Sequence, residues 1–180
     1  MIPNNGKLVI TPADGYTPHI GVLVSTLQRC RETTLGLVKD LSIHQLDYLF
    51  DEQDNAIGAL LLHLASLDVA FQEITFRGRN SMDVPELVSK WDVPMYLDAP
   101  ARQHIRGNPI EYYLSEMEAV RADTLAQLKQ HDDDWLWRES PDGDTLINNY
   151  YHWYHVYEDE INHRGEINWR LSRIPAAAVP

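Results

Sequence analysis

Asp159 and His163 are the residues whose types and spacing most clearly suggest chemistry, because an acid and an imidazole lie one helical turn apart. At about 100° per residue they are about 40° apart on a helical wheel, on the same side as Val156 and Ile167. That side is expected to be buried, and burying a carboxylate and an imidazole costs free energy unless each has a partner. A divalent cation is one such partner, because side chains at this spacing have Cβ atoms about 6 Å apart and can reach the same ion.

A third ligand would come from another helix, and His63 is the candidate. It interrupts the apolar face of a predicted helix that begins after Asn55 and ends near Phe76. Two imidazoles and one carboxylate leave at least one coordination position open, which suits Zn²⁺ and equally Ni²⁺, Fe²⁺ or Mn²⁺. An ion with an open position lowers the pKa of a bound water or thiol, and so provides a nucleophile near neutral pH.

Other histidines lie near this pair in the sequence. His155 lies one turn before Asp159 and is predicted to be a fourth ligand, a partner of a ligand or a proton carrier. His152 lies a further turn away, about 10 Å along the axis from Asp159, so no direct role with the same ion is predicted. A simpler alternative stays open, because Asp159 and His163 also have the spacing of an ordinary helix ion pair. The histidines predicted to lie at the surface are His19, His44, His104 and His131.

Four long helices are predicted to position these side chains, because apolar residues recur at helical spacing in four segments. The segments run from about Pro18 to Asp40, Asn55 to Phe76, Asn108 to Leu128 and Thr145 to Arg173. Thr17, Asn55 and Asn108 are the expected N-caps. No strand is predicted.

The link from Gly78 to Gly107 contains three prolines and is long enough to span a helical bundle. The helices on either side of it therefore need not be antiparallel neighbours, and a short helix is predicted within it near Glu86 to Trp91. The expected fold is all-α, a four-helix bundle with this long crossover between its second and third helices. It forms a single domain over residues 1–180, with an N-terminal arm at 1–16 and a tail at 175–180.

Charge and composition narrow the classes of partner. The net charge is −12 and Lys and Arg do not cluster, which argues against nucleic acid. The run from Asp132 to Asp134 is interpreted as a solvated loop or helix end. No run approaches the about 18 consecutive apolar residues of a membrane span, and the N-terminus lacks a signal-like pattern. Cys30, the only cysteine, is expected to be buried. A cytoplasmic protein with no membrane partner is expected.

Two segments resemble the DinB-like (DinB/YfiT) superfamily of metal-dependent proteins. Residues 55–68, with His63 after several apolar residues and before Leu-Ala, are similar to the family's second-helix segment. Residues 155–167 resemble its fourth-helix segment, in which an H-x3-H pair is followed by Arg-Gly and a polar residue. The four-helix layout with a long crossover is similar too, so the resemblance spans most of the chain in architecture.

The resemblance implies a metal site and, less specifically, a reaction. Position by position, the metal ligands fall on His63, Asp159 and His163, and Asp159 stands where the family has the first histidine of its pair. Aspartate binds hard and borderline divalent ions and lowers the charge of the site by one, so this departure could shift metal preference or weaken binding. Relatives include metal-dependent thiol transferases and often form homodimers, which implies a low-molecular-weight thiol as a substrate and a homodimeric assembly.

Three interpretations remain. In the first, a metal-dependent transferase activates a thiol that attacks a small electrophile, with His155 or Glu158 assisting proton transfer. In the second, a non-catalytic bundle keeps the site as a structural clip or leaves it empty, and acts in stress response or partner binding. In the third, the protein is a metal-dependent hydrolase. The sequence has no Ser-His-acid motif, phosphate loop or dinucleotide fingerprint that favours another enzyme class.

Overall fold

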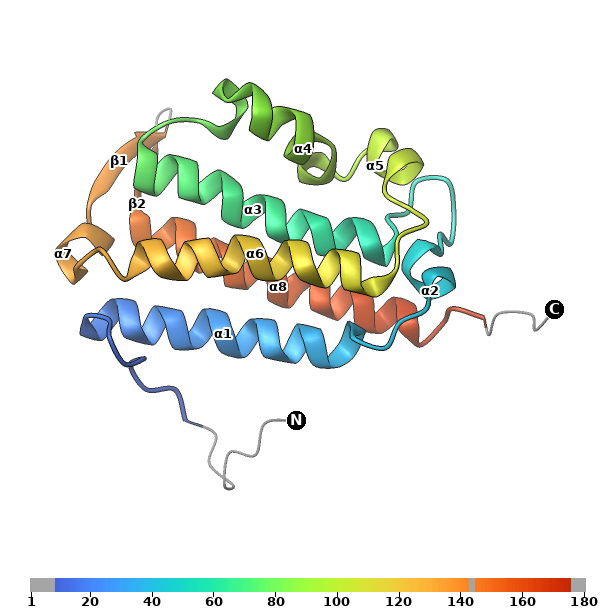
Figure 1. Cartoon of the computed structure of the whole chain (residues 1–180), viewed down its shortest axis with the longest axis horizontal. Coiled ribbons are helices and arrows are strands. Elements are labelled where there is room, and N and C mark those ends of the chain that lie inside the picture. The colour runs from blue at the N-terminus through green and yellow to red at the C-terminus, as the bar shows by residue number, and fades with distance from the viewer. Residues whose placement is uncertain (1–8, 143–144, 176–180) are drawn as a thin grey trace.

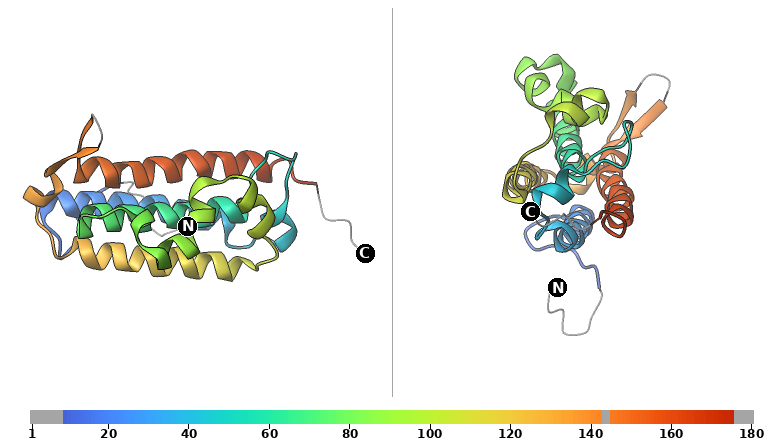
Figure 2. Two further views of the ribbon diagram at one scale, coloured as in Figure 1. Left: turned by 90° about the horizontal axis from the view of Figure 1, so that it is seen from above. Right: turned by 90° about the vertical axis from the view of Figure 1, so that its right-hand side faces the viewer.

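The computed structural model describes residues 9–142 and 145–175, and these residues are mostly helical (Figure 1). Its long helices are α1 (Pro18–Val38), α3 (Ile57–Arg77), α6 (Ile110–Leu128) and α8 (Asn149–Leu171). α1 and α8 run in one direction and α3 and α6 in the other (Figure 1). Seen end-on, α3 lies beside α6 and α8, and α1 lies beside the same two helices (Figure 2). The buried apolar side chains of the described residues form two clusters. The prediction of an all-α fold is therefore confirmed for most of the described residues.

Short elements connect the long helices. They are α2 (Ile43–Asp47), the 3-10 helix η1 (Ser81–Asp83), α4 (Pro85–Tyr96), α5 (Ala99–His104) and α7 (Asp133–Leu136). The segment that holds η1, α4 and α5 lies on the outside of α3 and returns the chain to the end at which α3 began (Figures 1 and 2). Because of this return, α6 runs parallel to α3. The helix predicted near Glu86 to Trp91 is present as α4 and extends further in both directions.

A short hairpin precedes α8, and the prediction of no strand was wrong here. β1 (Glu139–Asp142) pairs antiparallel with β2 (Thr145–Asn148). The predicted helix start at Thr145 was therefore four residues early, and Asn148 is the N-cap whose side chain accepts a hydrogen bond from the backbone N–H of Tyr151. Strands this short carry too little alternation to be separated from a helical pattern. Residues 143–144, between the two strands in the sequence, lie outside the described residues.

Two of the expected N-caps were also assigned to the wrong residue. α3 begins after Ala56, and the side chain of Asn55 instead accepts a hydrogen bond from Arg102 at 3.5 Å. α6 begins after Pro109, and the amide of Asn108 instead donates to the hydroxyl of Tyr113 at 3.5 Å. Asn55 thus pairs with a residue of the crossover segment and Asn108 with a side chain of the first turn of α6, so neither side chain follows the local capping rule.

The acidic run at 132–134 is not simply solvated, because Asp133 caps α1 from a distant part of the chain. Its Oδ1 accepts hydrogen bonds from the hydroxyl of Thr17 at 2.5 Å and from the backbone N–H groups of His19 and Ile20 at 3.0 and 3.1 Å. Thr17 is the predicted N-cap of α1, but its own side chain makes no capping bond. Burial raises the pKa of Asp133, while these hydrogen bonds lower it by more.

We expect Asp133→Ala to lower the free energy of unfolding by about 1–2 kcal/mol, because the first turn of α1 loses its acceptor. Asp133→Asn keeps a side-chain oxygen and should lose less. The stability from Asp133 should be present above the pKa of an unfolded aspartate, about 4, and lost as the pH falls below it. Urea unfolding measures both effects, with Asp134→Ala as the exposed control. Equal stability of Asp133→Ala and Asp134→Ala would contradict this capping role.

Most residues of α3 are buried, and the buried ones are mainly apolar. This helix is long and apolar enough to cross a membrane, but 83% of its most apolar window is buried inside the fold, as in the core helix of a soluble protein. Cys30 is buried as predicted, with 6% of its surface exposed. His19, His44 and His104 are exposed as predicted, but His131 is half-buried and stacks on Trp135, with ring centroids 4.1 Å apart.

Four buried charged side chains, one from each long helix, also meet in the core: Arg31, Asp68, Arg121 and Glu160. Arg31 Nε lies 3.0 Å from Glu160 Oε1, and Arg121 Nε lies 2.8 Å from Asp68 Oδ2. Two longer contacts complete the network. Arg31 lies 3.8 Å from Asp68, and Arg121 lies 3.6 Å from Glu160. We call these four residues the core charge quartet. Two positive and two negative charges balance within it.

Candidate metal centre

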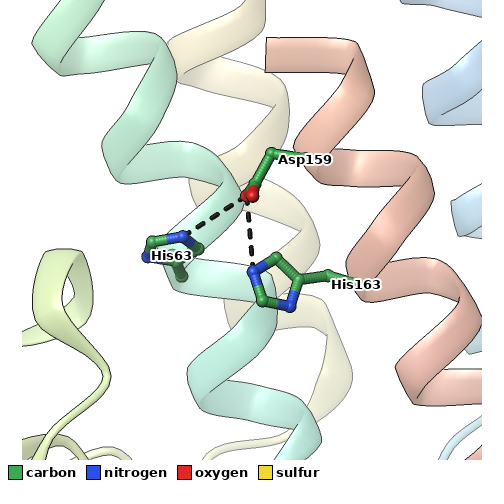
Figure 3. A group of neighbouring side chains, drawn as sticks. All are labelled: His63, Asp159 and His163. Atoms are coloured by element: carbon green, nitrogen blue, oxygen red, sulfur yellow. Dashed lines mark ion pairs between the residues drawn. The ribbon is translucent and has the colours of Figure 1, made fainter. Parts of the chain in front are cut away.

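The three sequence-predicted ligands converge between α3 and α8 (Figure 3). His63 Nε2 and His163 Nε2 each lie 3.4 Å from Oδ2 of Asp159. One ligand atom from each of the three residues lies within 4.8 Å of the other two. A common point that all three side chains can reach therefore exists, as the sequence predicted.

Each helix presents its ligands for a simple geometric reason. On α8, Asp159 and His163 are one turn apart, so their side chains extend from the same face toward α3 (Figure 3). On α3, His63 stands between Leu62 and Leu64, which are 6% and 2% exposed, while its own side chain is 12% exposed. The Asp159 and His163 side chains are each 17% exposed. The centre is thus mostly buried but still reached by solvent.

The second ring nitrogen of each histidine already has a partner. His63 Nδ1 lies 3.1 Å from the carbonyl oxygen of Pro94, near the end of α4. His163 Nδ1 lies 2.8 Å from Oε2 of Glu166. Both partners are acceptors, so each Nδ1 carries the hydrogen and each neutral imidazole has its free lone pair on Nε2. This is the arrangement that orients histidine ligands in metal sites.

Asp159 supplies the anionic member of the group. Its Oδ2 is buried and has no hydrogen-bond partner among the described residues. Burial raises the pKa of Asp159, but His63 and His163 in their protonated forms lower it by more, so the carboxylate is ionised at neutral pH. A buried carboxylate oxygen facing two imidazole lone pairs fits a divalent cation, which would satisfy all three donors at once.

In the absence of an ion, a proton can partly take its place. Burial lowers the pKa of His163, but its hydrogen bond to Glu166 and the charge of Asp159 raise it by more. The hydrogen bonds from His163 and Arg170 lower the pKa of Glu166 to about 2. Because a metal requires the neutral imidazole, an ion at this site would compete with the proton that His163 retains.

The predicted catalytic residues His155 and Glu158 form a separate pair on α8. His155 Nδ1 lies 3.2 Å from Glu158 Oε2, and the hydroxyl of Tyr154 donates to Glu158 Oε1 at 2.6 Å. Their side chains are 41% and 39% exposed. His155 is not one of the three converging ligands, and its role and that of Glu158 stay predictions.

Sequence reasoning missed the two acceptors behind the histidines. Glu166 follows His163 by three residues, so the spacing on one helix face was a signal that could have found it. The Pro94 carbonyl is a backbone group from a different element, and no pattern of residue types indicates it. It is available to His63 because α4 ends at Tyr96, where the last carbonyls of a helix lack internal partners.

The fold and this geometry define a mostly helical protein with a His-Asp-His cluster that could hold a divalent metal ion. A comparison with protein families matches residues 22–169 to the mycothiol S-transferase family. The match covers most of the chain and includes His63, Asp159 and His163. The chain therefore belongs to this family, which is part of the DinB/YfiT-like metalloenzyme superfamily, and the resemblance seen in the sequence is confirmed. Membership implies a small thiol-related substrate. No curated protein matches the chain.

Proposed function

We propose that this protein is a divalent-metal-dependent thiol S-transferase, with His63, Asp159 and His163 as the metal ligands. The observation that carries the proposal is that one ligand atom from each of these three residues lies within 4.8 Å of the other two. Family membership supports the choice of a thiol over water as the activated group. The ion would be Zn²⁺, Ni²⁺, Fe²⁺ or Mn²⁺, because the donor set suits each of them.

In this proposal, metal binding and proton transfer are carried out by different residues. A divalent ion bound at the centre would supply a Lewis acid that lowers the pKa of a thiol. Asp159 and the two histidines would hold and orient that ion, and their partial exposure leaves the centre in contact with solvent. His155 or Glu158, which form a pair on α8, would assist the transfer of the proton released from the thiol.

We also propose a bundle architecture, a cellular location, an oligomeric state and a class of partner for this protein. The four long helices would form a single DinB/YfiT-type four-helix bundle, with residues 78–109 as its crossover. We propose a cytoplasmic protein that assembles as a homodimer, with a small molecule and neither nucleic acid nor a membrane as its partner. The net charge of −12 supports the exclusion of nucleic acid.

We expect the protein purified without chelator to contain a divalent metal, and to couple a low-molecular-weight thiol to an electrophile. Monochlorobimane is a suitable probe, because the thiol sulfur displaces chloride and the thioether is fluorescent. Elemental analysis identifies the ion, and turnover should stop with a chelator and return with added metal. Consumption of an ester without any thiol would favour the hydrolase. A protein with no metal and no thiol-dependent turnover would favour the non-catalytic bundle.

A further inference from the structure

A chain of charged side chains leads from His163 away from the three ligand atoms. Oε2 of Glu166 accepts from His163 Nδ1 at 2.8 Å, and Oε1 of the same carboxylate accepts from Arg170 Nη2 at 2.5 Å. Arg170 Nη1 then donates to Asp54 Oδ1 at 2.5 Å. The other oxygen of Asp54 accepts from the backbone N–H of Phe50 at 3.0 Å. We call Glu166, Arg170 and Asp54 the histidine relay.

The relay fixes the orientation of the carboxylate that touches His163. Each oxygen of Glu166 has one donor, so rotation of the carboxylate would break two charge-assisted hydrogen bonds. The Arg170 side chain is 6% exposed and the Asp54 side chain 12% exposed, so the distal part of the relay is largely shielded from water. Pairs shielded in this way are screened less than exposed ones.

The relay also joins the two elements that carry the ligands. Glu166 and Arg170 lie on α8 with Asp159 and His163, whereas Asp54 lies in the segment just before α3, the helix of His63. A shift of the start of α3 along α8 would therefore break the Asp54–Arg170 pair. The same contacts that orient His163 thus tie α8 to the beginning of the other ligand-bearing helix.

The two histidines are held differently. His63 Nδ1 meets a neutral backbone carbonyl, whereas His163 Nδ1 meets a carboxylate. An ionised acceptor forms the stronger hydrogen bond and makes the opposite nitrogen a better metal ligand. The acceptor of His163 is also the one that a side-chain substitution can remove.

We propose that Glu166, held in place by Arg170 and Asp54, is a positioning residue that keeps the hydrogen of His163 on Nδ1 and directs its Nε2 to the metal. This inference rests on the proposed metal site and adds to it the residues that set its affinity. The relay is expected to act through His163 rather than by touching the ion or the substrate.

The test compares Glu166→Ala, Glu166→Gln and Asp54→Asn with the wild-type chain. Glu166→Ala should weaken Zn²⁺ binding by about 10–100-fold, measured by competition with a chromophoric chelator. Glu166→Gln should recover part of this loss, because its amide oxygen can still accept from Nδ1. In metal-free protein, ¹⁵N chemical shifts of His163, read where the imidazole is neutral, should move toward the Nε2–H tautomer in Glu166→Ala. Asp54→Asn should give a smaller shift in the same direction.

Glu32→Gln is the matched control, because Glu32 also pairs with a basic residue three positions away, Arg29, but at an exposed surface of α1. It should leave Zn²⁺ affinity and the His163 tautomer unchanged. Unchanged affinity and tautomer in Glu166→Ala would overturn the positioning role, as would an equal loss in the alanine and glutamine variants. A wild-type protein that binds no Zn²⁺ would instead count against the proposed function, and the tautomer shift would still decide whether Glu166 positions His163.

Discussion

Replacing Asp159 by alanine is expected to abolish tight divalent-metal binding, whereas replacing it by histidine is expected to preserve it. Asp159 Oδ2 lies 3.4 Å from both ligand nitrogens, so Asp159→Ala removes the only anionic donor of the group. The metal affinity should fall by more than the factor of about 10–100 that is typical when a residue that only supports a ligand is removed. Asp159→His restores the H-x3-H pattern of the superfamily and keeps three donors.

The two variants should also differ in metal preference. Carboxylates suit harder ions such as Mn²⁺, while imidazoles suit Zn²⁺ and Ni²⁺, so Asp159→His should lower the affinity for Mn²⁺ relative to Zn²⁺. Titration calorimetry with both ions measures this ratio. Asp123→Ala is the control, because Asp123 is a half-exposed aspartate on α6 that pairs with Arg77. Wild-type affinity in Asp159→Ala would show that the cluster is an ion pair, which is the simpler alternative that the sequence left open.

Features set by spacing on one helix could be predicted from the sequence. Asp159 and His163 were found because an acid and an imidazole share the helix face of Val156 and Ile167, which are 1% and 0% exposed. His63 was found because it interrupts an apolar stripe. The ends of the long helices were predicted less well, since the side chains of Asn55 and Asn108 pair with other side chains and not with the helix N–H groups that the capping rule assigns to them.

Apart from the meeting of His63 with Asp159 and His163, the polar contacts that join distant segments were not predicted. Asp133 caps α1 by accepting from Ile20, which lies 113 residues earlier in the sequence. Nothing in the run of three aspartates distinguishes Asp133 from its neighbours. Asp54 and Arg170, which also pair, are 116 residues apart in the sequence. Such contacts depend on how the helices pack, so they are known only once the fold is known.

The core charge quartet is the feature on which stability should depend most strongly. Arg31 and Arg121 also donate to the carbonyl oxygens of Met117 and Leu27, so both guanidinium groups tie helices together as well as pairing with acids. Removing one acid would leave two buried positive charges facing a single negative one. We expect Glu160→Leu to lower the free energy of unfolding by about 3–5 kcal/mol, because an uncompensated buried charge is costly.

Removing a whole pair should cost much less than removing one member. Within the described part of the chain, three atoms of the quartet, Arg31 Nη2, Asp68 Oδ1 and Arg121 Nη2, have no hydrogen-bond partner, so the network does not recover the full cost of its own burial. The double variant Arg31→Met/Glu160→Leu restores neutrality and fills the space with apolar atoms, and should be closer to the wild type in stability than Glu160→Leu alone. Urea unfolding measures both, with Glu32→Gln as the exposed control, whose pair is worth about 0–1 kcal/mol. A Glu160→Leu variant no less stable than this control would show that the quartet is not a determinant of the fold. Because Glu160 follows Asp159 on α8 and Asp68 shares α3 with His63, a loss of the quartet should also loosen the alignment of the two helices on which the candidate metal ligands lie.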